Sequence, residues 1–181
     1  MTLEEIYHKY HKLVYNLALQ YVQNKEDAEE ITQDTFVSVH QSLHKFNENS
    51  QLSTWIYRIA INKSLDYIKA KKRQKRFAIF TSLFNADSDE IKHDAFNFNH
   101  PGVLLEQKET VSKIFQLIND LPPNQRTALI LSKLEQKSQK DIGEIMEISP
   151  KAAESLIQRA KVSLEKKLIV RRKTKNKTSK H

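Results

Sequence analysis

The chain has 181 residues and carries 30 Lys and Arg against 22 Asp and Glu, which gives a net charge of +8. It has no cysteine, which excludes a disulfide framework and a thiolate metal site. No hydrophobic signal region opens the chain and no apolar run is long enough for a membrane span, so we expect a soluble cytoplasmic protein.

The composition favours an all-α fold. There are only 2 glycines, whereas Lys, Glu, Gln, Leu and Ile are abundant. The excess of basic residues favours a polyanionic partner, either nucleic acid or an anionic membrane, although many basic surfaces are merely solvated.

Apolar residues three and four apart predict three helices in an N-terminal domain, residues 1–76. The first covers roughly residues 6–21. Asn24 is the expected N-cap of the second helix, with Asp27 at its third helical position. A polar interruption follows at residues 44–51.

Ser53 is the expected N-cap of the third helix, which runs from about Thr54 to Arg73 or beyond. Residues 77–105 then show little regular period, a local acidic bias and the breaker Pro101-Gly102. We assign this stretch to a linker that could hold one short helix, with its phenylalanines docked on a domain surface.

Helical spacing resumes in a C-terminal domain, residues 106–170. Its first helix ends at Leu121-Pro122-Pro123, and three shorter helices are expected over residues 124–134, 139–146 and 150 to about 168. The basic tail, residues 171–181, is expected to fray or to follow a polyanion.

Residues 138–161, SQKDIGEIMEISPKAAESLIQRAK, have the form of a helix-turn-helix. Ser149 can cap the second helix, and Pro150 suits its first position because that N–H has no helical partner. The buried stripe of the second helix is Ala153, Ile157, Ala160 and Leu164. The outward residues are then Lys151, Ala152, Glu154, Ser155, Gln158 and Arg159.

A helix of this kind fits the major groove. Arg159 could donate to guanine, Gln158 to adenine, and Glu154 could accept from cytosine. Lys140 and Lys161 would lie near phosphates. A helical hairpin in a bundle core would explain the same spacing, and Glu147 stands in the turn where Gly would cost less.

The third helix carries a second candidate site. Its polar residues are spaced four, four, three and four apart: Arg58, Asn62, Asp66, Lys69 and Arg73. Trp55 and its aromatic neighbours offer stacking platforms for unpaired bases, beside cations for the backbone. The alternative is that Trp55 is core, Asp66 pairs with Lys63 or Lys69, and the basic run 69–76 is solvated.

The second helix is acidic, with Glu26, Asp27, Glu29, Glu30 and Asp34. Such a face should avoid DNA, and it would suit a basic protein partner or solvent.

Three segments together resemble the two-domain extracytoplasmic-function (ECF) sigma factors of bacteria. DAEEITQDTF at 27–36 is similar to the helix that binds the clamp helices of RNA polymerase. STWIYRIAINKSLDYIKAKKR at 53–73 is similar to the segment that opens and reads the minus-ten element. Residues 121–164 resemble the domain that reads the minus-thirty-five element.

The resemblance implies a role for each set of residues. The core-polymerase surface would be Asp27, Glu30, Gln33 and Asp34. The minus-ten strand would be read by Phe46, Asn47, Ser50, Gln51, Trp55, Arg58, Asn62, Asp66, Lys69 and Arg73, the first four on a loop that pockets a flipped base. The minus-thirty-five element would be read by Lys140, Lys151, Ala152, Glu154, Ser155, Gln158 and Arg159.

In three places the chain differs from the usual family pattern. Glu147 stands where the family often has Gly, and Glu154 and Leu156 stand where it often has a basic residue. Because of these differences, the family pattern does not determine which minus-thirty-five sequence the chain recognises.

The expected function is promoter recognition and melting as a sigma factor. The expected partners are core RNA polymerase, through its β and β′ subunits, promoter DNA in double-stranded and melted form, and an anti-sigma factor. We expect no cofactor, no metal and no enzymatic activity, because the histidines lack metal-ligand spacing and no nucleophile motif is present. The rivals are a stand-alone helix-turn-helix regulator, usually a dimer on a palindrome, and a helical nuclease.

Overall fold

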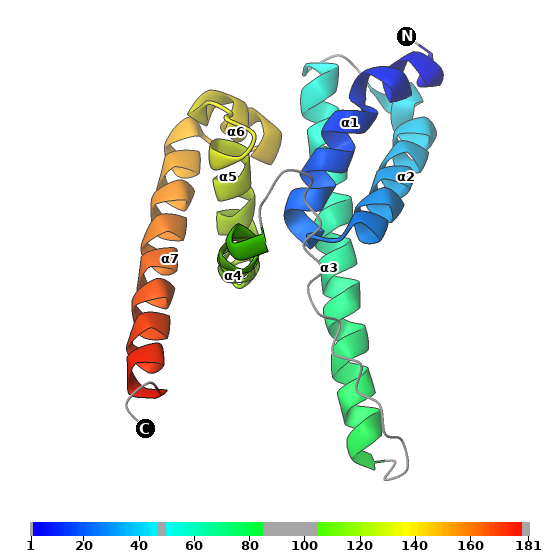
Figure 1. Ribbon diagram of the computed structural model, residues 1–181. Coiled ribbons are helices and arrows are strands. Elements are labelled where there is room, and N and C mark those ends of the chain that lie inside the picture. The colour runs from blue at the N-terminus through cyan, green and yellow to red at the C-terminus, as the bar shows by residue number, and fades with distance from the viewer. Residues whose placement is uncertain (1, 47–49, 85–104, 179–181) are drawn as a thin grey trace. The chain divides into compact units, whose positions relative to one another are not determined.

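The computed structural model describes residues 2–46, 50–84 and 105–178, and every regular element in these ranges is a helix (Figure 1). The all-α prediction is therefore confirmed. The chain divides into two compact units, Met1–Pro101 and Gly102–His181.

In unit 1 the described residues form three long helices, α1 (Leu3–Val22), α2 (Lys25–Ser42) and α3 (Leu52–Phe84), with a short 3-10 turn, η1, at Leu43–Lys45. α1, α2 and the first half of α3 pack against one another, while the second half of α3 extends beyond α1 and α2 (Figure 1). The centre of this bundle is apolar and closed to solvent, and it includes Ile6, Val14, Leu17, Tyr21, Ile31, Val39 and Ile56.

The helix starts in unit 1 follow local capping chemistry. Asn24 Oδ1 accepts a hydrogen bond from the Asp27 amide at 2.8 Å, so the predicted cap of α2 is confirmed. The predicted cap of α3 is wrong, because α3 begins at Leu52 and the Gln51 carbonyl accepts the first helical bond, from Trp55. Leu52 is half-buried and Ile56, one turn later, is fully buried, so core packing favours the earlier start.

α3 is also longer than the predicted domain. Residues 77–84, which we assigned to the linker, continue the helix. The sequence FAIFTSLF contains no Gly or Pro, so nothing breaks the helix before Phe84. Of the remainder of the predicted linker, residues 85–104 lie outside the described residues, and Leu105 begins the next helix.

In unit 2 the described residues 105–178 form four helices, α4 (Leu105–Asn119), α5 (Pro123–Lys133), α6 (Gln139–Met146) and α7 (Pro150–Thr178). α5 and α6 both pack on α7. Their shared core includes Leu117, Ala128, Ile130, Leu131, Ile142, Ala153 and Ala160. The buried guanidinium of Arg126 donates to the Asn119 and Leu121 carbonyls, and this closes the turn between α4 and α5.

α7 runs much further than the predicted end near Leu168. It continues to Thr178, so most of the basic tail is helical, and the last three residues of that tail, 179–181, lie outside the described residues. After Pro150 the sequence holds no Gly or Pro, and Lys and Arg are good helix formers that interact favourably with a helix C-terminus.

Within the described ranges, none of the helices has the length and apolar character needed to cross a membrane.

Candidate nucleic-acid interface

The starts of α6 and α7 are both capped by serine side chains. Ser138 and Asp141 form a capping box at the start of α6, where the Asp141 amide donates to Ser138 Oγ at 3.1 Å. The hydrogen bond from the Ser138 hydroxyl to the Asp141 carboxylate, 2.7 Å long, lowers the pKa of Asp141. Ser149 Oγ accepts from the Ala152 amide at 3.1 Å, so the predicted cap of α7 is confirmed.

Two backbone requirements fix the sharpness of the turn between α6 and α7. Glu147 adopts a left-handed conformation with φ 57° and ψ 44°. The Ile148 amide then donates to the Gly143 carbonyl at 2.9 Å. This approach is so close that a Cβ on Gly143 would lie 2.8 Å from the Ile148 carbonyl oxygen. Gly143 therefore allows α7 to start where it does.

The exposed face of α7 agrees with the predicted reading face. Ala153, Ile157 and Ala160 are buried, and Leu164 is half-buried. Ala152 and Lys161 are half-buried, and the remaining members of the predicted set are exposed: Lys140, Lys151, Glu154, Ser155, Gln158 and Arg159. The first turns of α7 thus present donors and acceptors on one side, as a helix in a major groove requires.

In unit 1, α3 presents a polar stripe to solvent. Asn62, Asp66, Lys69 and Arg73 are exposed, and Arg58 is half-buried. Lys69 Nζ lies 3.2 Å from Asp66 Oδ1, so this part of the alternative interpretation holds in the structure. The two side chains are 67% and 71% exposed, and such an exposed pair is weak enough to open for a ligand.

Two aromatic side chains are in contact beside the predicted flipped-base loop, residues 45–53: Phe46 belongs to the loop and Trp55 to the first turn of α3. The Phe46 and Trp55 ring centroids are 5.1 Å apart with the rings inclined by 38°, and both side chains are half-buried. Trp55 is therefore not a closed core residue. Ser50 is half-buried and Gln51 is exposed, whereas Asn47 lies outside the described residues.

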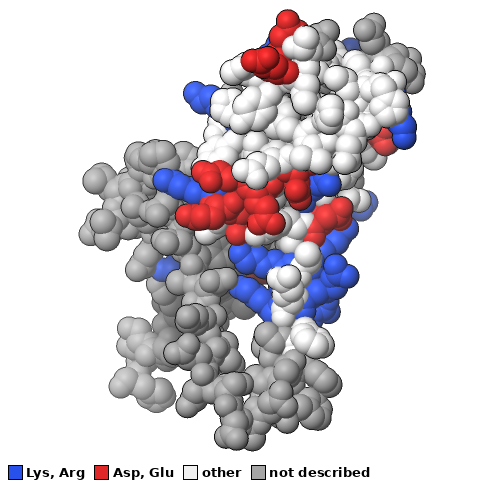
Figure 2. Space-filling view, turned by 90° about the vertical axis from the view of Figure 1, so that its right-hand side faces the viewer, with Lys and Arg blue, Asp and Glu red and all other residues white. Residues whose placement is uncertain are grey.

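The acidic helix lies directly beside the basic part of α3. Figure 2 shows a band of acidic side chains with Lys and Arg side chains gathered next to it, and Glu26, Glu29, Glu30 and Asp34 of α2 are all exposed. Of the predicted core-polymerase residues, Glu30, Gln33 and Asp34 are exposed. Val37, one turn from Gln33, is 54% exposed and extends this face with an apolar side chain.

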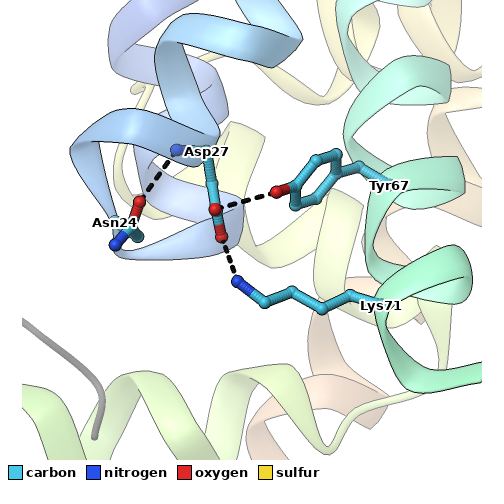
Figure 3. Close-up of polar contacts among 4 residues, drawn as sticks. All are labelled: Asn24, Asp27, Tyr67 and Lys71. Carbon is cyan, nitrogen blue, oxygen red and sulfur yellow. Dashed lines mark hydrogen bonds and ion pairs between the residues drawn. The ribbon is translucent and has the colours of Figure 1, made fainter. Parts of the chain in front are cut away.

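Asp27 is placed differently from the other three predicted residues of that surface. Its side chain is only 15% exposed and points at α3, where it meets Tyr67 and Lys71 (Figure 3). Sequence reasoning missed this contact. The available signal was that Ala60, Ser64, Tyr67 and Lys71 form one helical stripe.

Comparison with known proteins gives matches over both units. The family model described as Sigma-70 region 2 matches residues 6–74, and the model described as Sigma-70, region 4 matches residues 112–164. The RNA polymerase sigma-H factor of Pseudomonas aeruginosa is 29% identical over 160 residues, covering 88% of this chain and 82% of that protein. The ECF RNA polymerase sigma factor SigM of Bacillus subtilis is 28% identical over 167 residues, covering 91% and 94%.

Solved structures show the same fold. CnrH in complex with the cytosolic domain of CnrY matches with a TM-score of 0.61 at 18% identity, over 93% of this chain and 88% of that one. The sigma factor RpoE of Bartonella quintana, solved with the anti-sigma factor NepR, matches with a TM-score of 0.60 at 21% identity, over 92% and 96%.

Proposed function

The chain belongs to the sigma-70 family as a sigma factor of the ECF type, and from this premise we propose how its residues direct RNA polymerase to promoters. The proposal rests on one observation, which is that surfaces of different charge and shape lie on different helices. Unit 1 has an exposed acidic face on α2 beside an exposed polar and basic stripe on α3, and unit 2 has an exposed helix-turn-helix face.

Core RNA polymerase binds the acidic face in this proposal, through its β and β′ subunits. Glu30, Gln33 and Asp34 form the charged and polar part, and Val37 adds an apolar centre. Acidic side chains on one helix attract a basic partner helix over a distance set by the ionic strength, while a desolvated apolar residue supplies affinity.

Unit 2 reads the minus-thirty-five element as duplex DNA. The start of α7 enters the major groove, where Arg159 donates to guanine and Gln158 to adenine. Lys140 and Lys151 hold phosphates, which adds affinity without sequence information. Glu154 accepts from a cytosine amino group.

Unit 1 reads the minus-ten element as it opens. Asn62 and Asp66 contact the unpaired strand, Lys69 and Arg73 hold its backbone, and the Phe46–Trp55 pair lies beside a flipped base. Extrusion of a base costs a few kcal/mol, which stacking and hydrogen bonds to the base edge offset. The protein performs no covalent chemistry itself and acts in the cytoplasm, where the polymerase works.

An anti-sigma factor controls the free protein in this proposal. One protein with the same fold, RpoE, was solved with the anti-sigma factor NepR, and another, CnrH, was solved with the cytosolic domain of CnrY. The exposed acidic and basic faces of unit 1 give a regulator of mixed charge a surface to cover.

The test is transcription in vitro from a promoter library with purified core polymerase. We expect transcripts that depend on the protein, and the transcribed templates should share two elements at a fixed separation. Core polymerase alone and core with the Asp34→Lys variant are the controls. Specific binding of the free protein to a symmetric duplex site, with no transcript, would instead indicate a stand-alone regulator.

A further inference from the structure

Asp27 joins the acidic helix to the DNA-reading helix. Tyr67 Oη donates to Asp27 Oδ1 at 2.8 Å, and Lys71 Nζ lies 2.6 Å from Asp27 Oδ2 (Figure 3). The Asp27 amide also donates to Asn24 Oδ1, so the backbone that carries this carboxylate is held at the first turn of α2. Both carboxylate oxygens are therefore engaged by α3.

The surroundings make this contact more than an exposed ion pair. The Tyr67 ring packs against the apolar cluster of Ala18, Ala28 and Ile31. Lys71 Nζ lies 5.9 Å from the centroid of the same ring. Burial and the hydrogen bond to Asp27 raise the pKa of Tyr67, so the phenol stays a donor. Charge-assisted hydrogen bonds with little exposure are stronger than neutral ones.

Helix geometry relates this contact to the reading stripe. At about 100° per residue, Tyr67 and Lys71 lie on the side of α3 roughly opposite to Asn62, Lys69 and Arg73. The exposures agree, because those three residues are exposed, whereas Tyr67 and Lys71 are half-buried against α2. A rotation of α3 about its axis would therefore break the contact and turn the stripe away at the same time.

We propose that Asp27, Tyr67 and Lys71 are positioning residues that hold the reading stripe of α3 at a fixed angle to the polymerase-binding helix α2. Lys71 is then excluded from the phosphate contacts of the basic run, because its ammonium group is held by Asp27. The inference rests on the proposed function and adds to it a coupling between docking and melting.

The test uses holoenzyme assembled from core polymerase and full-length variants. Asp27→Asn, Tyr67→Phe and Lys71→Met each remove one part of the contact, and the Asp27→Asn/Lys71→Met double variant completes a cycle. Lys72→Met is the matched control, because it removes the same charge from an exposed neighbour. The measurements are core affinity, open-complex formation from a fluorescent base in the minus-ten element, and the salt dependence of promoter binding.

We expect Lys71→Met to lower open-complex formation about three- to thirtyfold more than Lys72→Met does, as pairs in contact usually couple. Core affinity should stay within about twofold, and the double variant should be no worse than the worse single variant. The slope of log affinity against log salt should not change for Lys71→Met, whereas loss of a phosphate contact lowers it by about one.

Two results would overturn the proposal. One is a slope reduced by about one in Lys71→Met, with effects of Asp27→Asn and Lys71→Met that multiply, because Lys71 would then be a phosphate contact. The other is a loss of core affinity, minus-thirty-five binding and open-complex formation by the same factor in these variants. A fold that is merely destabilised would produce that result. The wild-type protein distinguishes a failure of this inference from a failure of the proposed function. If the wild type itself forms no open complex, the proposed function is wrong.

Discussion

The ring centroids of Trp55 and Phe46 lie 5.1 Å apart, so an aromatic side chain that follows η1 meets one from the first turn of α3. Trp55 is the only tryptophan of the chain and is half-buried, which makes its fluorescence a direct reporter of this place.

We expect an unpaired minus-ten oligonucleotide to change Trp55 emission when it binds the isolated full-length protein, in which Trp55 is the only tryptophan. Phe46→Ala should weaken that binding by about 1–3 kcal/mol, the usual cost of losing one aromatic stacking platform. Fluorescence titration at fixed salt measures it. Tyr7→Ala, which removes an exposed aromatic side chain elsewhere in unit 1, should leave the affinity unchanged. Equal losses in both variants would exclude a stacking role for Phe46.

The acidic face of α2 predicts a charge-dependent interaction with polymerase. Asp34→Lys replaces an exposed acid by a base, so we expect core affinity to fall by about 1–3 kcal/mol and the loss to shrink at high salt. Glu4→Lys, an equally large charge change on the exposed start of α1, is the matched control. Unchanged core affinity in Asp34→Lys would mean that polymerase binds another face.

Two substitutions in the turn of unit 2 should change stability in opposite directions. Gly143→Ala places a methyl group against the Ile148 carbonyl and should destabilise unit 2 by about 1–3 kcal/mol. Glu147→Gly removes the strain of a left-handed residue and should stabilise it by about 0.5–1 kcal/mol.

Hydrogen exchange of the α6 and α7 amides in both variants measures these changes. The contrary result is equal stability of the Gly143→Ala variant and the wild type, which would mean that the turn is wider than described.

Tyr67 predicts a loss of stability at alkaline pH. Its pKa in the folded chain is raised above the ordinary value of 10.0, mainly by burial and by the hydrogen bond to Asp27. The neutral phenol therefore contributes stability that is fully present below pH 10.0 and is lost as the pH rises above it.

We expect the free energy of unfolding to fall more steeply above that pH in the wild type than in Tyr67→Phe. Denaturant titrations over a pH series measure this, and ultraviolet absorbance follows tyrosinate formation. Tyr67 should be among the last tyrosines to ionise, and Asp27→Asn should bring its ionisation to lower pH. Identical pH profiles for wild type and Tyr67→Phe would contradict the placement of the phenol.

Local chemistry explains which parts of the fold the sequence could predict. Asn24, Ser149 and Pro150 act on neighbours within three residues, so their pattern is visible in the chain itself. The start of α3 at Leu52 depends instead on burial of Ile56 in a core that other helices complete. Helix propensity depends only on neighbouring residues, so it does not include the free energy of burying Ile56 against other helices.

The candidate site shows the same limit. The exposed stripe from Asn62 to Arg73 follows from helical spacing alone. The engagement of Asp27 does not, because its partners Tyr67 and Lys71 are 40 and 44 residues away in the chain. In the sequence, Asp27 stands among other acidic residues and is predicted to share their surface. Only the packing of α2 on α3 shows that its side chain points away from that surface.

The length of α3 gives the contact at Asp27 a mechanical meaning. From Lys71 to Phe84 the helix continues for about 20 Å at 1.5 Å per residue. With Lys71 as the pivot, a tilt of about 10° there would displace the far end by about 3–4 Å, which is about a third of the width of a helix. A molecule bound at that end would therefore exert a torque on the contact between Asp27 and Lys71, and a small force would be enough to break this contact.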